Sequence, residues 1–102
     1  MAYVDSVAIA ANEPEDADGC FDFGMVYSAG AGVAVDLVEA HKWFNIAAMR
    51  GHGDAARLRR EIAELMSDSE IGQAQRAARD WLKRHPQPQP QPQNVVAIRA
   101  AA

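Results

Sequence analysis

The chain has 102 residues, 49% of them hydrophobic, which leaves room for one small domain with a thin core. Cys20 is the single cysteine, so an internal disulfide and a cysteine-based metal site are excluded, and a reducing, cytoplasmic compartment is favoured. The net charge of -4 is unevenly distributed, because residues 1–40 hold eight acids and no Lys or Arg while residues 41–102 hold ten bases and six acids. Faces of opposite sign are either merely solvated, or they steer different partners, or they bring like molecules together head to tail.

Residues 1–14 are predicted to be a flexible or docked segment. They contain no basic start followed by an apolar run, so we expect no secretory signal, and no apolar run in the chain approaches the ~20 residues of a membrane span. The only stretch with a trace of strand-like alternation is Tyr3 to Ile9. Apolar residues in this segment are candidates to complete a small core, namely Tyr3, Val4, Val7 and Ile9.

A first helix is predicted over residues 15–29, where acidic side chains near the N-terminus complement the helix dipole. Phe23 and Tyr27 lie four residues apart and mark its buried face. The opposite face offers apolar side chains beside an acid, which suits a partner helix unless the N-terminal segment covers it. The candidate partner-binding residues on that face are Asp22, Met25, Val26 and Ala29.

Two glycines, Gly30 and Gly32, lie in the small-residue loop that follows the first helix. A phosphate-binding P-loop needs a preceding strand and a lysine followed by Ser or Thr. Here the preceding element is helical, and Asp36 would repel a phosphate. We therefore predict a turn between two packed helices.

A second helix is predicted over residues 37–50. Asp36 is its expected N-cap, Glu39 completes a capping-box arrangement, and Gly51 supplies the C-cap. Gly24 in the first helix costs about 1 kcal/mol relative to Ala, which indicates that the second helix approaches closely at that point. The apolar stripe of the second helix consists of Leu37, Ala40, Trp43, Phe44 and Ala47.

These two helices and their loop, residues 21–55, resemble a Sel1-like repeat, a relative of the tetratricopeptide repeats. The positions that carry the resemblance are Gly24, Tyr27, Gly30, Gly32, Val33, Asp36, Ala40, Trp43, Phe44, Ala47, Ala48 and Gly51. The positions that depart from the usual pattern are Gly19, Phe23 and Ala34. Residues 53–82 resemble the helical cap that ends many short bacterial Sel1-like proteins.

Two more helices are predicted, over residues 54–66 and from Asp68 to just before Pro86. Ser67 and Glu70 form a second capping box, at the start of the fourth helix. The apolar stripe of the third helix consists of Ala55, Leu58, Ile62 and Leu65. That of the fourth consists of Ile71, Ala74, Ala78 and Trp81.

The predicted fold is all-α: a short α-solenoid of two stacked antiparallel helix hairpins over residues 15–84. One hairpin is the full Sel1-like repeat and the other is a C-terminal capping hairpin. Repeat arrays generally need about three units for stability, so the N-terminal segment, a second copy of the chain or a partner must contribute. The side chains expected to be buried are Phe23, Tyr27, Trp43, Phe44, Leu58, Ile62 and Trp81.

Residues 85–93 form a Pro/Gln tract, which is predicted to be a stiff polyproline II spacer of ~3.1 Å per residue. Its prolines alternate with other residues, so a PxxP ligand motif is excluded. We expect the apolar peptide at residues 94–102 to be ordered only when it is docked on a partner or a second copy, the alternative being a plain disordered end. Its candidate partner-binding residues are Val95, Val96 and Ile98.

No catalytic group, cofactor site or metal site is expected. The histidines His41, His52 and His85 show no spacing that would pair one of them with Cys20 in a dyad. The acids of the third and fourth helices are typical of a solvated face rather than of carboxylates paired for proton transfer.

Two functions stay open. The first is a non-catalytic helical adaptor or accessory subunit that binds another protein, since Sel1-like relatives act as adaptors in signalling, protein quality control and cell-envelope regulation. The alternative is a nucleic-acid-associated regulator that uses the basic third and fourth helices, although interspersed acids and the lack of an aromatic platform disfavour it. The basic residues concerned are Arg57, Arg59, Arg60, Arg76, Arg79, Lys83 and Arg84.

Overall fold

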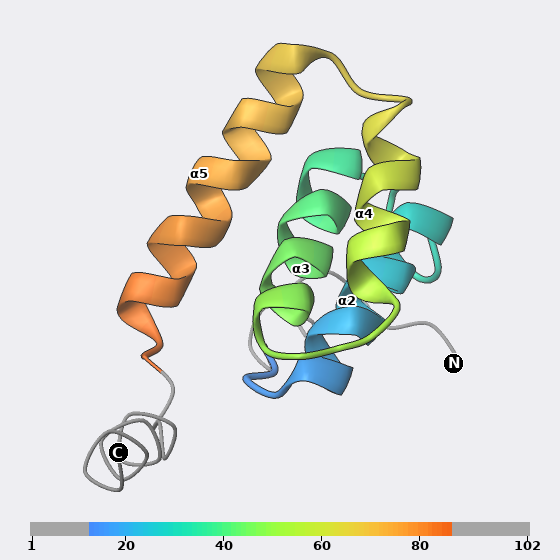
Figure 1. Ribbon diagram of the computed structural model, residues 1–102. Helices are drawn as coiled ribbons and strands as arrows, with labels where there is room; N and C mark the ends of the chain where they lie inside the picture. The colour runs from blue at the N-terminus through green and yellow to red at the C-terminus, as the bar shows by residue number, and fades with distance from the viewer. Residues whose placement is uncertain (1–12, 87–102) are drawn as a thin grey trace, which may run out of the picture.

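The computed structural model describes residues 13–86, and every regular element in that range is a helix (Figure 1). The elements are α2 (Ala17–Ala29), α3 (Leu37–Met49), α4 (Ala55–Ala63) and α5 (Asp68–Arg84). The all-α class is therefore confirmed for this part of the chain. The strand-like stretch at residues 3–9 and the apolar peptide at residues 94–102 lie outside the described residues.

The first hairpin lies close to its predicted bounds: α2 begins at Ala17, two residues after the predicted start, and α3 ends at Met49, one residue before the predicted end. The Asp16 side chain caps α2 by accepting a hydrogen bond from the Gly19 N–H at 3.1 Å. Gly30, at φ 72°, ends the helix in the left-handed conformation, and its N–H donates to the Val26 carbonyl. The loop then leads directly into α3, so the predicted helix–helix turn is confirmed.

Helix α3 is capped as predicted at one position and differently at another. Asp36 accepts from the Glu39 N–H at 3.1 Å, which confirms the N-cap. The Glu39 side chain does not complete the capping box, because it accepts instead from the Trp43 indole at 3.2 Å. At the other end the C-cap is Arg50, and Gly51 follows it in the left-handed region at φ 101°.

The last two helices differ in how well they match the prediction. Ser67 and Glu70 form the reciprocal capping box of α5, with bonds of 3.1 and 2.8 Å. Helix α4 ends at Ala63, three residues early, and the chain closes in a tight turn in which the Leu65 N–H donates to the Ile62 carbonyl. This turn, rather than another turn of α-helix, leads the chain to Ser67.

Helix α3 lies at the centre, and each of the other described helices packs on it (Figure 1). α2 and α3 form a closed hairpin, in which Gly24 and Phe44 meet. α4 and α5 diverge from the bend that joins them and make few contacts with each other (Figure 1). The second expected hairpin is therefore open, and its two helices bury their apolar sides against α3.

The core is centred on Trp43 and Trp81, each 1% exposed, whose rings meet edge to face with centroids 5.3 Å apart. Their predicted burial is confirmed, as is that of Phe44. Four other side chains expected to be buried are only half-buried: Phe23, Tyr27, Leu58 and Ile62. Helix α4 packs mainly on α3, and Leu65, the last residue of the predicted stripe, lies in the turn after α4 and is 73% exposed.

Candidate partner-binding site

Of the two predicted partner-binding surfaces, the outer face of α2 is the one that lies within the described residues. Asp22, Met25 and Ala29 are exposed there, and Met25 retains 43% of its surface. Val26 is half-buried, so it lies at the edge of this face and not at its centre. With Asp18, which is also exposed, the outward residues form one stripe, called here the α2 stripe: Asp18, Asp22, Met25 and Ala29.

Close packing on the inner side fixes which face of α2 is turned outward. Cys20 is fully buried in the core, and Gly24 is buried on the side of α2 that meets Phe44 of α3. A Cβ placed on Gly24 would lie 2.5 Å from the Phe44 ring, closer than real atoms approach. Rotation of α2 about its axis would break this contact, so the α2 stripe is held toward solvent.

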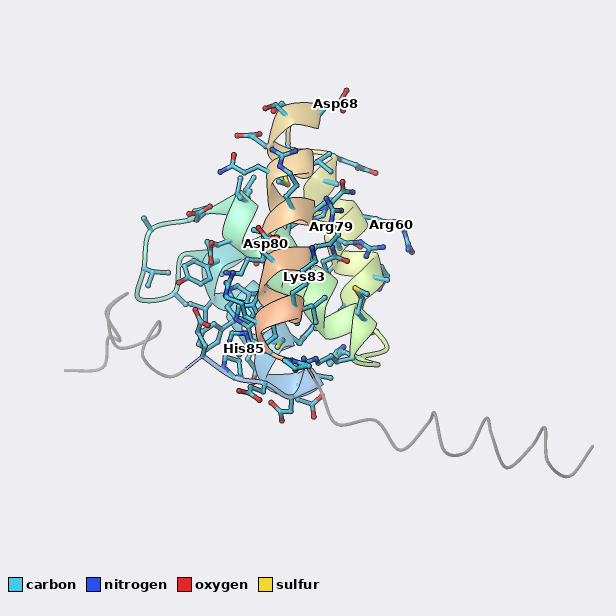
Figure 2. The ribbon with its side chains drawn as sticks, turned by 90° about the vertical axis from the view of Figure 1, so that its left-hand side faces the viewer. Arg60, Asp68, Arg79, Asp80, Lys83 and His85 are labelled. Atoms are coloured by element: carbon cyan, nitrogen blue, oxygen red, sulfur yellow. The ribbon has the colours of Figure 1, made fainter. Side chains whose placement is uncertain are left out.

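A second exposed stripe runs along α5, on the side opposite the buried Ala74, Ala78 and Trp81. It is called here the α5 stripe and consists of Gly72, Arg76, Arg79 and Lys83. The three charged members are exposed, and Gly72 is half-buried. Figure 2 shows Arg79 on the same side of the molecule as Arg60 of α4.

The charged members of the two stripes are largely without ion-pair partners inside the described part of the chain. Arg57 pairs with Asp54 and Glu61 at 3.7 and 3.1 Å. Among residues 13–86, Asp22, Arg79 and Lys83 form no such pair. Within the described part of the chain, Asp18 has one contact of this kind, with the His52 ring at 3.8 Å.

Arg50 has a role that the sequence did not reveal. Its guanidinium lies over the Trp81 ring, 5.1 Å from the centroid, and donates to the backbone carbonyls of Glu15 and His85. Trp81 in turn donates its indole N–H to the Glu13 carboxylate at 2.9 Å. One side chain thus joins the start of α2 to the end of α5. Both carbonyls lie 35 residues away along the chain, so no local pattern could have indicated these bonds.

Cys20 and His52 are not paired with each other. The Cys20 thiol points at the Pro14 carbonyl, 3.8 Å away, and burial raises its pKa to about 11. The His52 ring stacks on Phe21 at 3.9 Å, and its Nδ1 accepts from the Asp54 N–H at 3.1 Å. These contacts give both side chains a structural role at the base of the α2–α3 hairpin.

His41 is the one buried polar side chain in the described core, at 3% exposure. Its Nδ1 has no hydrogen-bond partner within residues 13–86. Burial lowers the pKa of this imidazole, and the nearby Arg59 guanidinium lowers it further. Both effects favour the neutral form of this buried ring of α3.

Three further points of the sequence analysis concern metal ligands, membrane spans and the C-terminal peptide. Within the described residues no three metal-ligating side chains gather, and no helix there is long and apolar enough to cross a membrane. Val95, Val96 and Ile98 lie outside the described range.

Comparisons with known proteins do not assign the chain to a family. No protein-family model matches it, and searches of curated proteins and of solved structures found no match either.

Proposed function

We propose that this protein is a small helical adaptor or accessory subunit that binds another protein and has no chemistry of its own. The observation that carries the proposal is the α2 stripe, where an exposed Met25 lies between Asp22 and Ala29 on a helix whose orientation is fixed. A flexible, polarizable methionine beside an acid on an outward helix face suits a partner helix. A reducing, cytoplasmic compartment fits a lone buried thiol.

The proposed family is the Sel1-like repeat, with α2 and α3 as the repeat and α4 and α5 as its cap. Three features of the first hairpin support it: Gly24 against Phe44, the left-handed Gly30 at the turn, and Asp36 as the N-cap of α3. The central position of α3 is also what a solenoid requires, since each repeat must pack on its neighbour.

The test is capture of a partner from the source cell by crosslinking, with Met25→Glu as the variant. A buried charge at the centre of an interface removes most of the binding energy, so the captured partner should be lost. Met49→Glu is the matched control, because Met49 is 67% exposed on another helix. Retention of the same partner by Met25→Glu would show that the α2 face is not the binding face.

A second candidate function rests on the basic residues of α4 and α5. Arg60 and Arg79 lie on the same side of the molecule (Figure 2), and neither forms an ion pair among the described residues. Such a surface can neutralise phosphates, so RNA or DNA binding with a steep salt dependence would support a nucleic-acid-associated regulator. A complex that withstands salt and contains one protein would favour the adaptor.

A further inference from the structure

The α2 stripe and the α5 stripe have the same spacing along their helices. Positions 18, 22, 25 and 29 of α2 are separated by four, three and four residues. Positions 72, 76, 79 and 83 of α5 are separated by four, three and four residues as well. Because this spacing reads the same in both directions, the two stripes stay in register when the helices run antiparallel, at ~1.5 Å of rise per residue.

In that antiparallel register the charges are complementary. Asp22 faces Arg79 and Asp18 faces Lys83, so each acid of one stripe meets a base of the other. The parallel register is worse, because it places Asp18 against Gly72 and Ala29 against Lys83. The antiparallel arrangement also brings the acidic N-terminal end of α2 to the basic C-terminal end of α5.

The uncharged members of the stripes are complementary in size. Ala29 faces Gly72, and two small residues at one level allow the helix backbones to approach closely. Met25 faces Arg76, whose aliphatic stem can cover the methionine side chain. In the single chain the Arg76 guanidinium lies beside Gly72, 3.3 Å from the position of an added Cβ, and a flexible side-chain end of this kind can move aside.

We infer that the α2 stripe of one molecule binds the α5 stripe of a second copy of this chain, with the helices antiparallel. This inference rests on the proposed function only in using the same α2 face as a binding surface, and it names a second copy of the chain as the occupant. The contact joins two different surfaces, and each molecule carries one of each. Such a head-to-tail contact builds rings where the geometry closes and open chains where it does not.

The test is the mass of the protein in solution, measured by sedimentation velocity up to about 0.5 mM and at about 50 mM salt, where surface charges are weakly screened. Asp22→Arg places two cations in contact, and Arg79→Asp places two acids in contact. Each variant alone should associate at least ~10-fold more weakly than the original chain. Circular dichroism checks that both exposed positions tolerate the change.

Restoration is the decisive measurement. An equimolar mixture of Asp22→Arg and Arg79→Asp should associate, because the intact α5 stripe of the first chain meets the intact α2 stripe of the second. The double variant Asp22→Arg/Arg79→Asp should also recover association, since its charges are exchanged and still complementary. Arg57→Asp is the control, because it removes an exposed arginine of α4 that lies in neither stripe.

Three results would overturn the inference: a single species of monomer mass at every concentration, a mixture that stays monomeric, or an Asp22→Arg effect that Arg79→Asp does not share. In each of these cases, loss of a captured foreign protein on Met25→Glu would leave the adaptor proposal intact. If self-association behaves as expected while no foreign protein depends on Met25, the inference stands and the adaptor proposal fails. RNA bound through Arg79 with no self-association would also defeat the inference, in favour of the nucleic-acid alternative.

Discussion

Gly24 of α2 lies directly against the Phe44 ring of α3, and a Cβ at Gly24 would meet two ring carbons at 2.5 Å. Phe44 itself is 1% exposed, so its ring has little room to move away. The contact brings the backbone of α2 close to α3 and so determines the separation of the two helices. A glycine that weakens its own helix is thereby explained by tertiary packing.

The first prediction follows from this contact. Gly24→Ala should lower the free energy of unfolding by up to ~2 kcal/mol, because an overpacking cost of ~1–3 kcal/mol exceeds the gain of about 1 kcal/mol that alanine gives inside a helix. Urea denaturation followed by helix circular dichroism measures the change. Equal or greater stability in this variant would contradict the close approach.

Gly72 provides the opposite prediction at an otherwise similar helix position. A Cβ there meets only the end of the Arg76 side chain, at 3.3 Å. Gly72→Ala should therefore raise the free energy of unfolding of the monomer, by up to about 1 kcal/mol. A decrease as large as that expected for Gly24→Ala would mean that Gly72 is also constrained by packing.

The positions of the helices could be predicted from the sequence because their signals are local. Asp36 and Ser67 cap their helices through bonds to residues three positions away, a distance that the sequence displays directly. The early end of α4 was missed, since a tight turn at Leu65 competes with continued helix and the apolar spacing does not distinguish them. The presence of each helix followed from its capping residues and apolar spacing. The position at which α4 ends depended on local competition that these signals do not show.

The candidate site was predictable in the same partial way. The sequence placed Met25 on the face of α2 away from Tyr27, and the described structure leaves Met25 exposed. The hydrogen bonds of the Arg50 guanidinium were not predictable, because its partners are backbone carbonyls that only the fold brings near. The match between the two stripes also required the structure, since it depends on knowing that Asp22 and Arg79 are both exposed.

Acid should weaken the fold through His41. Its pKa is lowered from the ordinary 6.5 by burial and by Arg59. Below about pH 6.5 the imidazole therefore binds a proton more readily in the unfolded chain than in the folded chain. The stabilisation of the neutral ring is complete above about pH 6.5. It is lost as the pH falls toward the folded pKa, with a slope of at most ~1.4 kcal/mol per pH unit.

The measurement is urea denaturation at several pH values, on the original chain and on His41→Phe. The phenyl ring fills a similar space and has no nitrogen that can be protonated, so the decline in stability below about pH 6.5 should become shallower. An identical decline in the two proteins would place the acid sensitivity in other groups.

Removal of residues 87–102 tests whether these residues contribute to partner binding without contributing to the stability of the helical fold. Helix α5 ends at Arg84, and the His85 N–H donates to the Leu82 carbonyl, so helix content and thermal unfolding should be unchanged. Capture of a partner should weaken, because the deletion removes the apolar Val95, Val96 and Ile98. Full retention of the partner after the deletion would show that these three residues are not part of the binding site.

The last prediction concerns Arg50, whose guanidinium connects the two ends of the described fold. Arg50→Lys keeps the charge but cannot donate from two diverging nitrogens to the Glu15 and His85 carbonyls while covering Trp81. Charge-assisted hydrogen bonds contribute about 1.5–3 kcal/mol each when shielded, and this side chain is only half-buried, so a loss of ~1–3 kcal/mol is expected. Arg57→Lys is the matched control, since its two ion pairs are exposed and their loss should change stability by at most ~0.5 kcal/mol. If the two lysine variants unfold at the same urea concentration, Arg50 does not hold the start of α2 to the end of α5.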